Sequence, residues 1–266
     1  MKNILKRRFF AALLAVLMVF TGILFSACNR EPTATELLTK AALNTASLDS
    51  YAAVMKIDMS MSMMGMTIDV PMTVDMKIKN TLPSPALSAH CDMSMIGQQI
   101  KMDLYSDGEW MYFSIPATEF TEALQYKTKI SAADEYDFNE DVTDLLKELP
   151  EDLLKDVEPI KNEDGSYTIS ATLPTESFNE IYNDLLDSLS ADYGAIDMEI
   201  GNTKVEITVT ADGYYKEYIV DFTMKMNIED VEADATAKCS VVFENPGEPV
   251  EIVPIEGCEN FPESEM

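Results

Sequence analysis

Five methionines occupy eight consecutive positions in the segment MSMSMMGM, residues 59–66. Thioether side chains can act as soft ligands for Cu(I) when several of them converge on one point. The same side chains form an adaptable apolar surface when they lie side by side. Because Met alternates with Ser, we expect Met59, Met61 and Met63 on one face of a β-strand. This leaves three uses open: ordinary core packing, a wall that contacts lipid, or a copper site.

His90 is the only histidine in the 266 residues, so a catalytic set of nucleophile, histidine and acid would have to include it. Strand alternation places His90 on the side opposite to Cys91. The sequence contains no Gly-x-Ser-x-Gly turn and no glycine-rich phosphate loop. We therefore expect no catalytic residue, no cofactor and no enzymatic activity.

An acidic stretch in the middle of the chain has oxygen-bearing side chains at the spacing of an EF-hand calcium loop. Position 6 of such a loop requires glycine, but here it holds Val142, and position 8 holds Asp144. The pattern therefore favours an acidic loop before a helix, and we expect no metal site. Loop positions 1, 3, 5, 7 and 12 are held by Asp137, Asn139, Asp141, Thr143 and Glu148.

Three cysteines follow Cys28, and an odd number cannot all pair within one chain. Cys239 and Cys258 are the nearest candidates for a disulfide, which an exported protein could form. The alternative is that these two and Cys91 are reduced thiols that pack as small apolar side chains. The sequence leaves this choice open.

The first 27 residues have the layout of a secretory signal peptide, with a basic start followed by an apolar run. The run extends from Phe9 to Phe25 and is short for a membrane-spanning helix, which needs about 20 residues. It ends in FSAC, which resembles the lipobox of bacterial lipoproteins. In that family the cysteine receives a diacylglyceryl group and the signal is cut just before it.

The lipobox resemblance implies that Cys28 is the lipidated first residue of the mature protein. Acyl chains such as palmitate would then form its membrane anchor, and residues 28–33 would join the anchor to the folded part. We therefore expect the protein on the extracytoplasmic face of the cell membrane. Acidic residues outnumber basic ones by 47 to 19, and a net charge of −28 argues against a nucleic-acid partner. A protein partner is left unknown.

Residues 51–63 and 66–78 each alternate between apolar and polar side chains. The pattern predicts a long β-hairpin whose turn consists of Met64 and Gly65. Proline lacks an N–H donor. In this register Pro71 falls where a hairpin has no hydrogen bond to the facing strand, so proline is tolerated there.

The remaining pattern predicts more long strands and a few helices. A capping box at Thr33 and Glu36 begins a first helix. A helical pattern covers roughly 117–156, and the clearest helix covers 175–189. Turns are expected at Asp107-Gly108, Asp164-Gly165 and Asp212-Gly213. Further strands are expected at 87–95, 99–106, 109–115, 195–210, 214–228 and 231–243.

Long alternating strands predict an antiparallel sheet with one apolar face and one solvated face. The predicted fold class is α+β and rich in strands: a curled antiparallel sheet, or half-barrel, with helices covering its concave face. We expect a single domain at 34–255 and an acidic tail at 256–266. The lipobox, the short helix and the order of strands and helices resemble the LppX/LprG lipoproteins and the lipoprotein carrier LolA. The methionine-rich hairpin is similar to that of uncharacterised lipoproteins of Gram-positive bacteria.

The resemblance implies that the concave apolar face holds acyl chains. The expected function is that of a membrane-anchored lipoprotein that binds or shuttles an apolar, lipid-like ligand. The alternative is a non-catalytic cell-envelope protein that acts through protein–protein contacts. The side chains expected to line the ligand site are Met55, Met59, Met61, Met63, Met72, Met93, Phe222 and Met224.

Overall fold

The computed structural model describes residues 31–79, 85–118, 122–130, 154, 156–174, 196–228, 231–244 and 246–264. The chain divides into two units, Met1–Thr33 and Ala34–Met266, and every described element belongs to the second. These elements are α2 (Ala34–Ala46), β1 (Ser50–Met63), β2 (Met66–Lys79), β3 (Ala86–Met95), β4 (Gln98–Ser106), β5 (Trp110–Ile115), β6 (Leu124–Lys129), β7 (Ile160–Lys161), β8 (Tyr167–Leu173), β9 (Ile196–Ile200), β10 (Thr203–Val209), β11 (Tyr215–Ile228), β12 (Val231–Glu244) and the 3₁₀ helix η2 (Cys258–Asn260).

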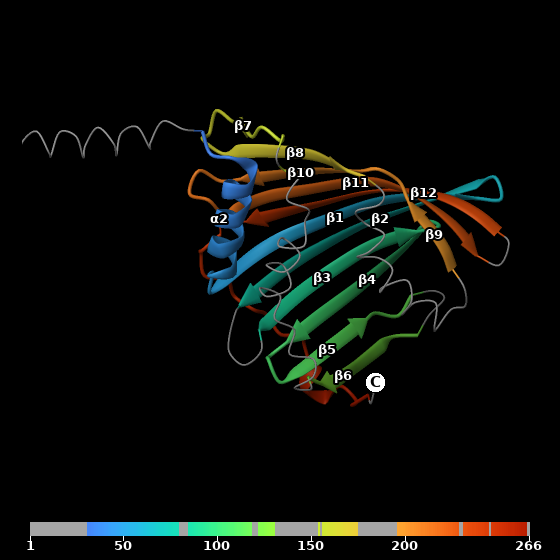
Figure 1. The fold of residues 1–266 in the computed structure, drawn as a ribbon. Coiled ribbons are helices and arrows are strands. Elements are labelled where there is room, and N and C mark those ends of the chain that lie inside the picture. Colours follow the sequence, from blue (N-terminus) through green and yellow to red (C-terminus); the bar gives the residue numbers. More distant parts are fainter. Residues whose placement is uncertain are drawn as a thin grey trace, which may run out of the picture. The chain divides into compact units, whose positions relative to one another are not determined.

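The strands form one twelve-stranded sheet in the order β6-β5-β4-β3-β2-β1-β12-β11-β10-β8-β7, with β9 paired to β11. Neighbouring strands are antiparallel, and the sheet is curled (Figure 1). Among the described residues its edge strands β6 and β7 do not pair, so the sheet is open. This confirms the predicted strand-rich, curled antiparallel architecture. Because β12 lies between β1 and β11, early and late parts of the chain meet inside the sheet.

The β1–β2 hairpin has the predicted register. Asp58 pairs with Pro71, and the turn consists of Met64 and Gly65. The φ angles of these two turn residues are 52° and 77°, as a type I′ turn requires. Hydrogen-bonded and non-hydrogen-bonded pairs alternate along the hairpin from the bonded pair Met63–Met66, so the pair Asp58–Pro71 is a non-hydrogen-bonded one. On its other side, β2 begins to pair with β3 only at Met72. The missing proline donor is therefore tolerated on both sides.

Glycine turns join the other hairpins as well. The predicted turns at Asp107-Gly108, Asp164-Gly165 and Asp212-Gly213 connect β4 to β5, β7 to β8 and β10 to β11. The structure adds a turn that we did not predict, Ile96-Gly97 between β3 and β4. Its φ angles of 52° and 76° make it a second type I′ turn.

The single strand predicted at 195–210 is wrong, because two strands occupy this range. Both β9 and β10 pair with β11, and their registers differ by one residue across the break at Gly201. Gly201 N donates a hydrogen bond to Thr223 O at 2.8 Å. A Cβ at this position would lie 2.3 Å from Thr223 Oγ1. Glycine at this position therefore avoids a clash with the side chain of Thr223 on the neighbouring strand.

The helical pattern predicted over 117–156 is wrong at residues 124–129, which form the edge strand β6. Here Leu124 and Tyr126 alternate with polar residues, and Tyr126 stacks on Phe113 of β5 at a centroid distance of 4.8 Å. Pairing with β5 therefore overrides the weak local preference. The predicted helix at 175–189, the calcium-like residues 137–148 and Cys28 lie outside the described residues. Most of the range expected to cover the sheet also lies outside them.

Helix α2 begins directly after Thr33, as predicted, and packs its apolar side on one end of the sheet. Its buried residues Leu37, Leu38 and Ala41 form a core with Ile169 and Tyr215. Tyr215 Oη donates a hydrogen bond to the backbone oxygen of Leu38 at 3.2 Å. The helix is thereby fixed over β8, β10 and β11.

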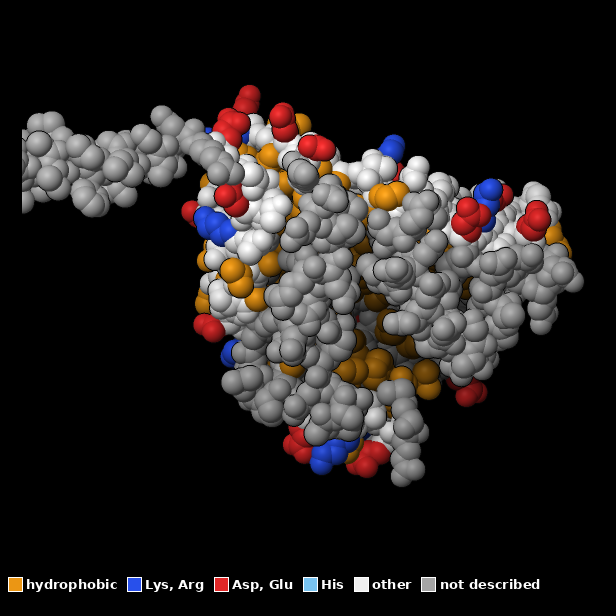
Figure 2. Space-filling model, in the orientation of Figure 1, with side chains coloured by type: hydrophobic (Ala, Val, Ile, Leu, Met, Phe, Trp, Pro, Cys, Tyr) orange, Lys and Arg blue, Asp and Glu red, His pale blue; other side chains and the backbone are white. Residues whose placement is uncertain are grey.

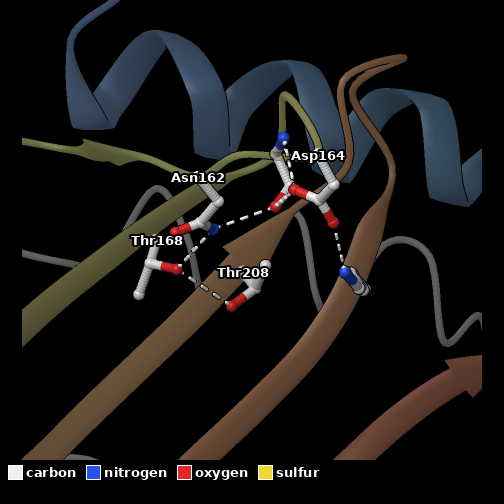
Figure 3. A network of polar contacts seen from close by, with 6 residues as sticks. Asn162, Asp164, Thr168 and Thr208 are labelled. Carbon is white, nitrogen blue, oxygen red and sulfur yellow. Dashed lines mark hydrogen bonds and ion pairs between the residues drawn. The ribbon is translucent and has the colours of Figure 1, made fainter.

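A polar network fixes the β7–β8 hairpin to β10 and β11 (Figure 3). Asn162 Nδ2 donates to Thr168 Oγ1 at 3.0 Å, and Thr168 Oγ1 lies 3.4 Å from Thr208 Oγ1. Asp164 accepts a hydrogen bond from Lys216 Nζ at 2.7 Å. This bond holds the pKa of Asp164 below its usual value. The network explains how a two-residue strand keeps its place at the sheet edge.

The C-terminal strap, residues 248–264, crosses the polar face of the sheet. It starts at β1, where Ser50 Oγ bonds to the strap backbone at positions 248 and 250. Cys258 and Phe261 then pack on Tyr112 of β5. Its end bonds to both backbone groups of Lys127 in β6. The strap therefore links the middle of the sheet to its edge.

Candidate functional site: the methionine-rich face

The eight predicted ligand-lining residues lie on one face of the sheet. Residues directly opposite on neighbouring strands share a face, as do residues two apart on one strand. The register places Met72 opposite Ile57 and Met93 opposite Met72. It also links Met59 through Ala237 to Phe222. All eight side chains are half-buried. The eight residues are Met55, Met59, Met61, Met63, Met72, Met93, Phe222 and Met224.

This methionine-rich face is almost free of charge. Among the positions that the described strands place on it, the only one held by Asp, Glu, Lys or Arg is Lys161, on the edge strand β7. Figure 2 shows hydrophobic side chains gathered in the recess on this side, with charged side chains around the rim. The apolar side chains of β1 and β2 thus form part of an apolar surface that extends over the sheet.

An alanine stripe runs along β12 in the middle of this face. Ala233, Ala235 and Ala237 are buried, with at most 6% of their surface exposed. Each lies between two large side chains, one on β1 and one on β11. The three rows are Met59–Ala237–Phe222, Met61–Ala235–Met224 and Met63–Ala233–Met226. Small side chains between large ones make a trough with an alanine floor, about 13 Å long.

Aromatic side chains close the end of the face that lies under α2. Tyr51, Tyr215 and Tyr218 surround Phe243 at centroid distances of 5.6–6.3 Å. Burial raises the pKa of Tyr51 to about 12 and also raises the pKa of Tyr218. The phenols therefore stay neutral at physiological pH, and this end of the face is also uncharged.

Two thiols also lie on the methionine-rich face. Cys91 pairs with Val74 and Met102, and Cys239 pairs with Ile57. Burial raises the pKa of both thiols, which favours the protonated form. Both are free, as is Cys258, which lies on the polar face against Tyr112. The disulfide considered between Cys239 and Cys258 is not formed, because the two residues lie on opposite faces.

His90 lies on the polar face, as alternation predicts. Its Nδ1 is 2.6 Å from Asp103 Oδ1 and its Nε2 is 3.2 Å from Asp92 Oδ2. The hydrogen bond to Asp103 raises the pKa of His90 most, against a smaller opposing effect of burial. His90 and Cys91 face opposite sides of β3, so they do not form a nucleophile–base pair. Among the described residues, no group of three His, Cys, Asp or Glu side chains could hold a metal ion.

Sequence reasoning identified the methionines but did not show that alanines form a floor between them. The alternation in VEADATAKC already placed Ala233, Ala235, Ala237 and Cys239 on one side of a strand. It did not show that this strand lies between β1 and β11, because those contacts join residues far apart in the chain. The aromatic end was missed for the same reason.

Comparisons with solved structures give distant likenesses. LprF from Mycobacterium bovis has 13% sequence identity, with 83% of this chain and 96% of that chain covered and a TM-score of 0.41. A DUF1329 family protein from Desulfovibrio piger has 7% identity, 79% and 92% coverage and a TM-score of 0.28. A β-barrel-like protein of the DUF1849 domain from Brucella abortus has 9% identity, 74% and 99% coverage and a TM-score of 0.21. Likenesses this distant carry no conclusion about function.

No curated protein matches the chain. In the part of the chain that the structure describes, no helix is both long and apolar enough to cross a membrane. A family model matches residues 33–254, which include the whole sheet with α2. The chain therefore belongs to the family of unknown function DUF6612.

Proposed function

We propose that this protein holds an apolar, lipid-like ligand on the methionine-rich face and does so without catalysing a reaction. One observation carries the proposal: in a chain with a net charge of −28, the described strands place one charged residue on this face, and that residue is at the edge. A large apolar face is unfavourable in contact with water, and a bound apolar ligand shields it from water.

The composition of the trough supports a ligand with loosely defined shape. Methionine has an unbranched, polarizable side chain that adapts to irregular apolar partners. Met61 and Met224 flank Ala235, and both are half-buried. A narrow floor of small side chains between adaptable walls suits a partner that is long and narrow, such as an acyl chain.

Ligand binding is tested with a substitution that fills the trough and a matched control on the other face of the sheet. In residues 34–266, Ala235→Leu places a larger side chain on the floor, whereas Thr236→Leu places the same side chain on the polar face of the same strand. We expect lipid to co-purify with the wild type and with Thr236→Leu, as detected by native mass spectrometry. Ala235→Leu should lose most of it while remaining folded by circular dichroism.

The rival function is contact with another protein of the cell envelope. A folded wild-type domain that carries no lipid, even after incubation with phospholipid and free fatty acid, would favour that rival. Equal lipid content in Ala235→Leu and Thr236→Leu would also contradict the trough as the ligand site.

We further propose that Cys28 carries the lipid anchor, on the extracytoplasmic side of the cell membrane. The FSAC segment supports this proposal. Cys28→Ala removes the thiol that would be acylated, so we expect the protein in the medium or retained as precursor. Wild-type membrane retention and wild-type mobility of Cys28→Ala on a gel would contradict it.

A further inference from the structure

Two hairpin turns at one end of the sheet present apolar side chains to solvent. Met64 in the β1–β2 turn and Ile96 in the β3–β4 turn are each 74% exposed. Met66 and Met95, which flank these turns, are 62% and 41% exposed. Met64 and Ile96 are the two most exposed large hydrophobic side chains among the described residues. We call residues 63–66 and 95–98 the hairpin tips.

The backbone of the tips is unusual for the residues that it carries. Met64 and Ile96 both have a φ of 52°, and they are the only described residues other than glycine with positive φ. The first position of a type I′ turn favours Asn, Asp or Gly, and a β-branched residue such as Ile is strained there. Strain and exposure are thus combined at the same two positions. Outliers of this kind cluster at functional sites.

The tips also lie in segments without charge. Residues 59–68 and 93–100 contain no Asp, Glu, Lys or Arg, although a quarter of all residues in the chain are charged. The polar residues around the turns are Ser, Thr and Gln. Aromatic residues, Arg and Met are enriched at protein interfaces, and of these the tips contain Met but no aromatic residue and no Arg. Their chemistry therefore suits the boundary between lipid headgroups and acyl chains better than a protein surface.

The register places both tips at the same end of the sheet. Met93 pairs with Met72, so Met95 lies level with Val70. The β1–β2 turn extends four residues beyond that level, which is about 13 Å. In Figure 1 the β1–β2 turn projects from the end of the sheet opposite to α2. Two narrow hairpins can insert into a fluid lipid surface, which does not need to match their shape.

We propose that the hairpin tips insert Met64 and Ile96 into the surface of a lipid bilayer with zwitterionic headgroups. Anionic headgroups are disfavoured because acidic side chains lie next to the tips. Asp69 is exposed on β2, and Asp234 pairs with Ser62 on β1. The proposal concerns a surface separate from the trough, and it holds whether or not the trough carries a ligand.

The test uses residues 34–266, the compact unit that contains all described elements, so that the N-terminal segment cannot mediate binding. Flotation with phosphatidylcholine vesicles measures the bound fraction. The double variant Met64→Asn/Ile96→Asn removes both apolar side chains and installs the residue that the turn favours, so the fold is retained. We expect vesicle binding to fall about tenfold or more, since the buried apolar area is lost.

The matched control is Leu43→Gln, which removes a side chain of similar size and 61% exposure from α2. It should bind vesicles like the wild type. Vesicles rich in phosphatidylglycerol should bind more weakly than phosphatidylcholine, and added salt should reduce this difference.

Three results would overturn the proposal. The first is a wild-type unit that does not float with phosphatidylcholine vesicles. The second is equal binding by the wild type and the double Asn variant, or equal loss in Leu43→Gln. The third is self-association of the wild type that the double Asn variant abolishes, because the tips would then contact a second copy of the chain.

Discussion

The single histidine couples the polar face to pH. His90 lies between Asp103 and Asp92, and both its ring and Asp103 are more than a third exposed. The hydrogen bond to Asp103 raises the pKa of His90 above its unfolded value of 6.5. Protonated His90 therefore stabilises the fold below the unfolded pKa. This contribution is lost as the pH rises through the folded pKa.

We expect the free energy of unfolding to decrease between pH 5.5 and pH 8.5 through His90, by no more than about 1 kcal/mol because the pair is solvent-screened. Urea unfolding of wild type and His90→Gln at both pH values measures this. The difference between them should be largest at the lower pH. Asp103→Asn serves as the control, since it removes the main partner and should flatten the same difference. A difference that grows towards high pH would contradict this assignment.

The beginning of β10 depends on one glycine. A Cβ on residue 201 would meet Thr223 Oγ1, so Gly201→Ala should destabilise the fold by about 1–3 kcal/mol. Thr223→Ala removes that oxygen from an exposed position, and the double variant Gly201→Ala/Thr223→Ala should regain most of the loss. Urea midpoints of the four proteins give the coupling. If the double variant is as unstable as Gly201→Ala, the loss of stability has a cause other than the contact with Thr223 Oγ1.

Among the elements, β1 contributes methionine side chains to the apolar face, and we expect that these side chains need only be apolar. Met59→Leu/Met61→Leu keeps volume and apolarity, so we expect it to fold and to lose less than about 1.5 kcal/mol for each substitution. Met59→Asp/Met61→Asp places two charges on an uncharged face and should prevent folding or ligand binding. Thermal unfolding and native mass spectrometry distinguish these results.

The same pair of Leu substitutions tests the copper alternative that the sequence left open. Leucine cannot coordinate Cu(I), whereas it serves an apolar wall as well as methionine does. We expect no stoichiometric Cu(I) binding in competition with a chelator on the reduced protein. Tight binding that disappears in Met59→Leu/Met61→Leu would contradict the proposed lipid-facing role and identify a metal site.

Local elements were predictable from the sequence where a turn and an alternating pattern act together. The register of β1 and β2 follows from the turn at Met64-Gly65 and the position of Pro71. The bulge at Gly201 was not predictable, because its cause is the side chain of Thr223 on a neighbouring strand. The edge strand β6 was missed because its pairing with β5 outweighs a short ambiguous pattern. The alanine trough needs contacts between strands that lie about 170 residues apart in sequence, which alternation alone cannot specify.

In the second unit as a whole, the C-terminal strap is the long-range link across the polar face. It borders a groove of about 590 Å³ that is lined by Val253, Pro254 and Ile255 together with the charged residues Lys77 and Glu244. At its end, Lys127 N donates to Pro262 O, and Ser264 N donates to Lys127 O, both at 2.9 Å. The strap thus occupies the free side of β6, which would otherwise be an open edge.

Shortening the chain after Glu256 should therefore weaken one side of the sheet more than its middle. The truncated protein loses Cys258 and Phe261, which pack on Tyr112, together with the hydrogen bonds to Lys127. Backbone amides of β5 and β6 should exchange faster with deuterium, while those of β1 and β12 keep their protection, because those strands are held by neighbours on both sides. The point variant Phe261→Ala should show a smaller change in the same strands. A uniform loss of protection across all strands would instead mean that the strap stabilises the whole fold rather than its edge.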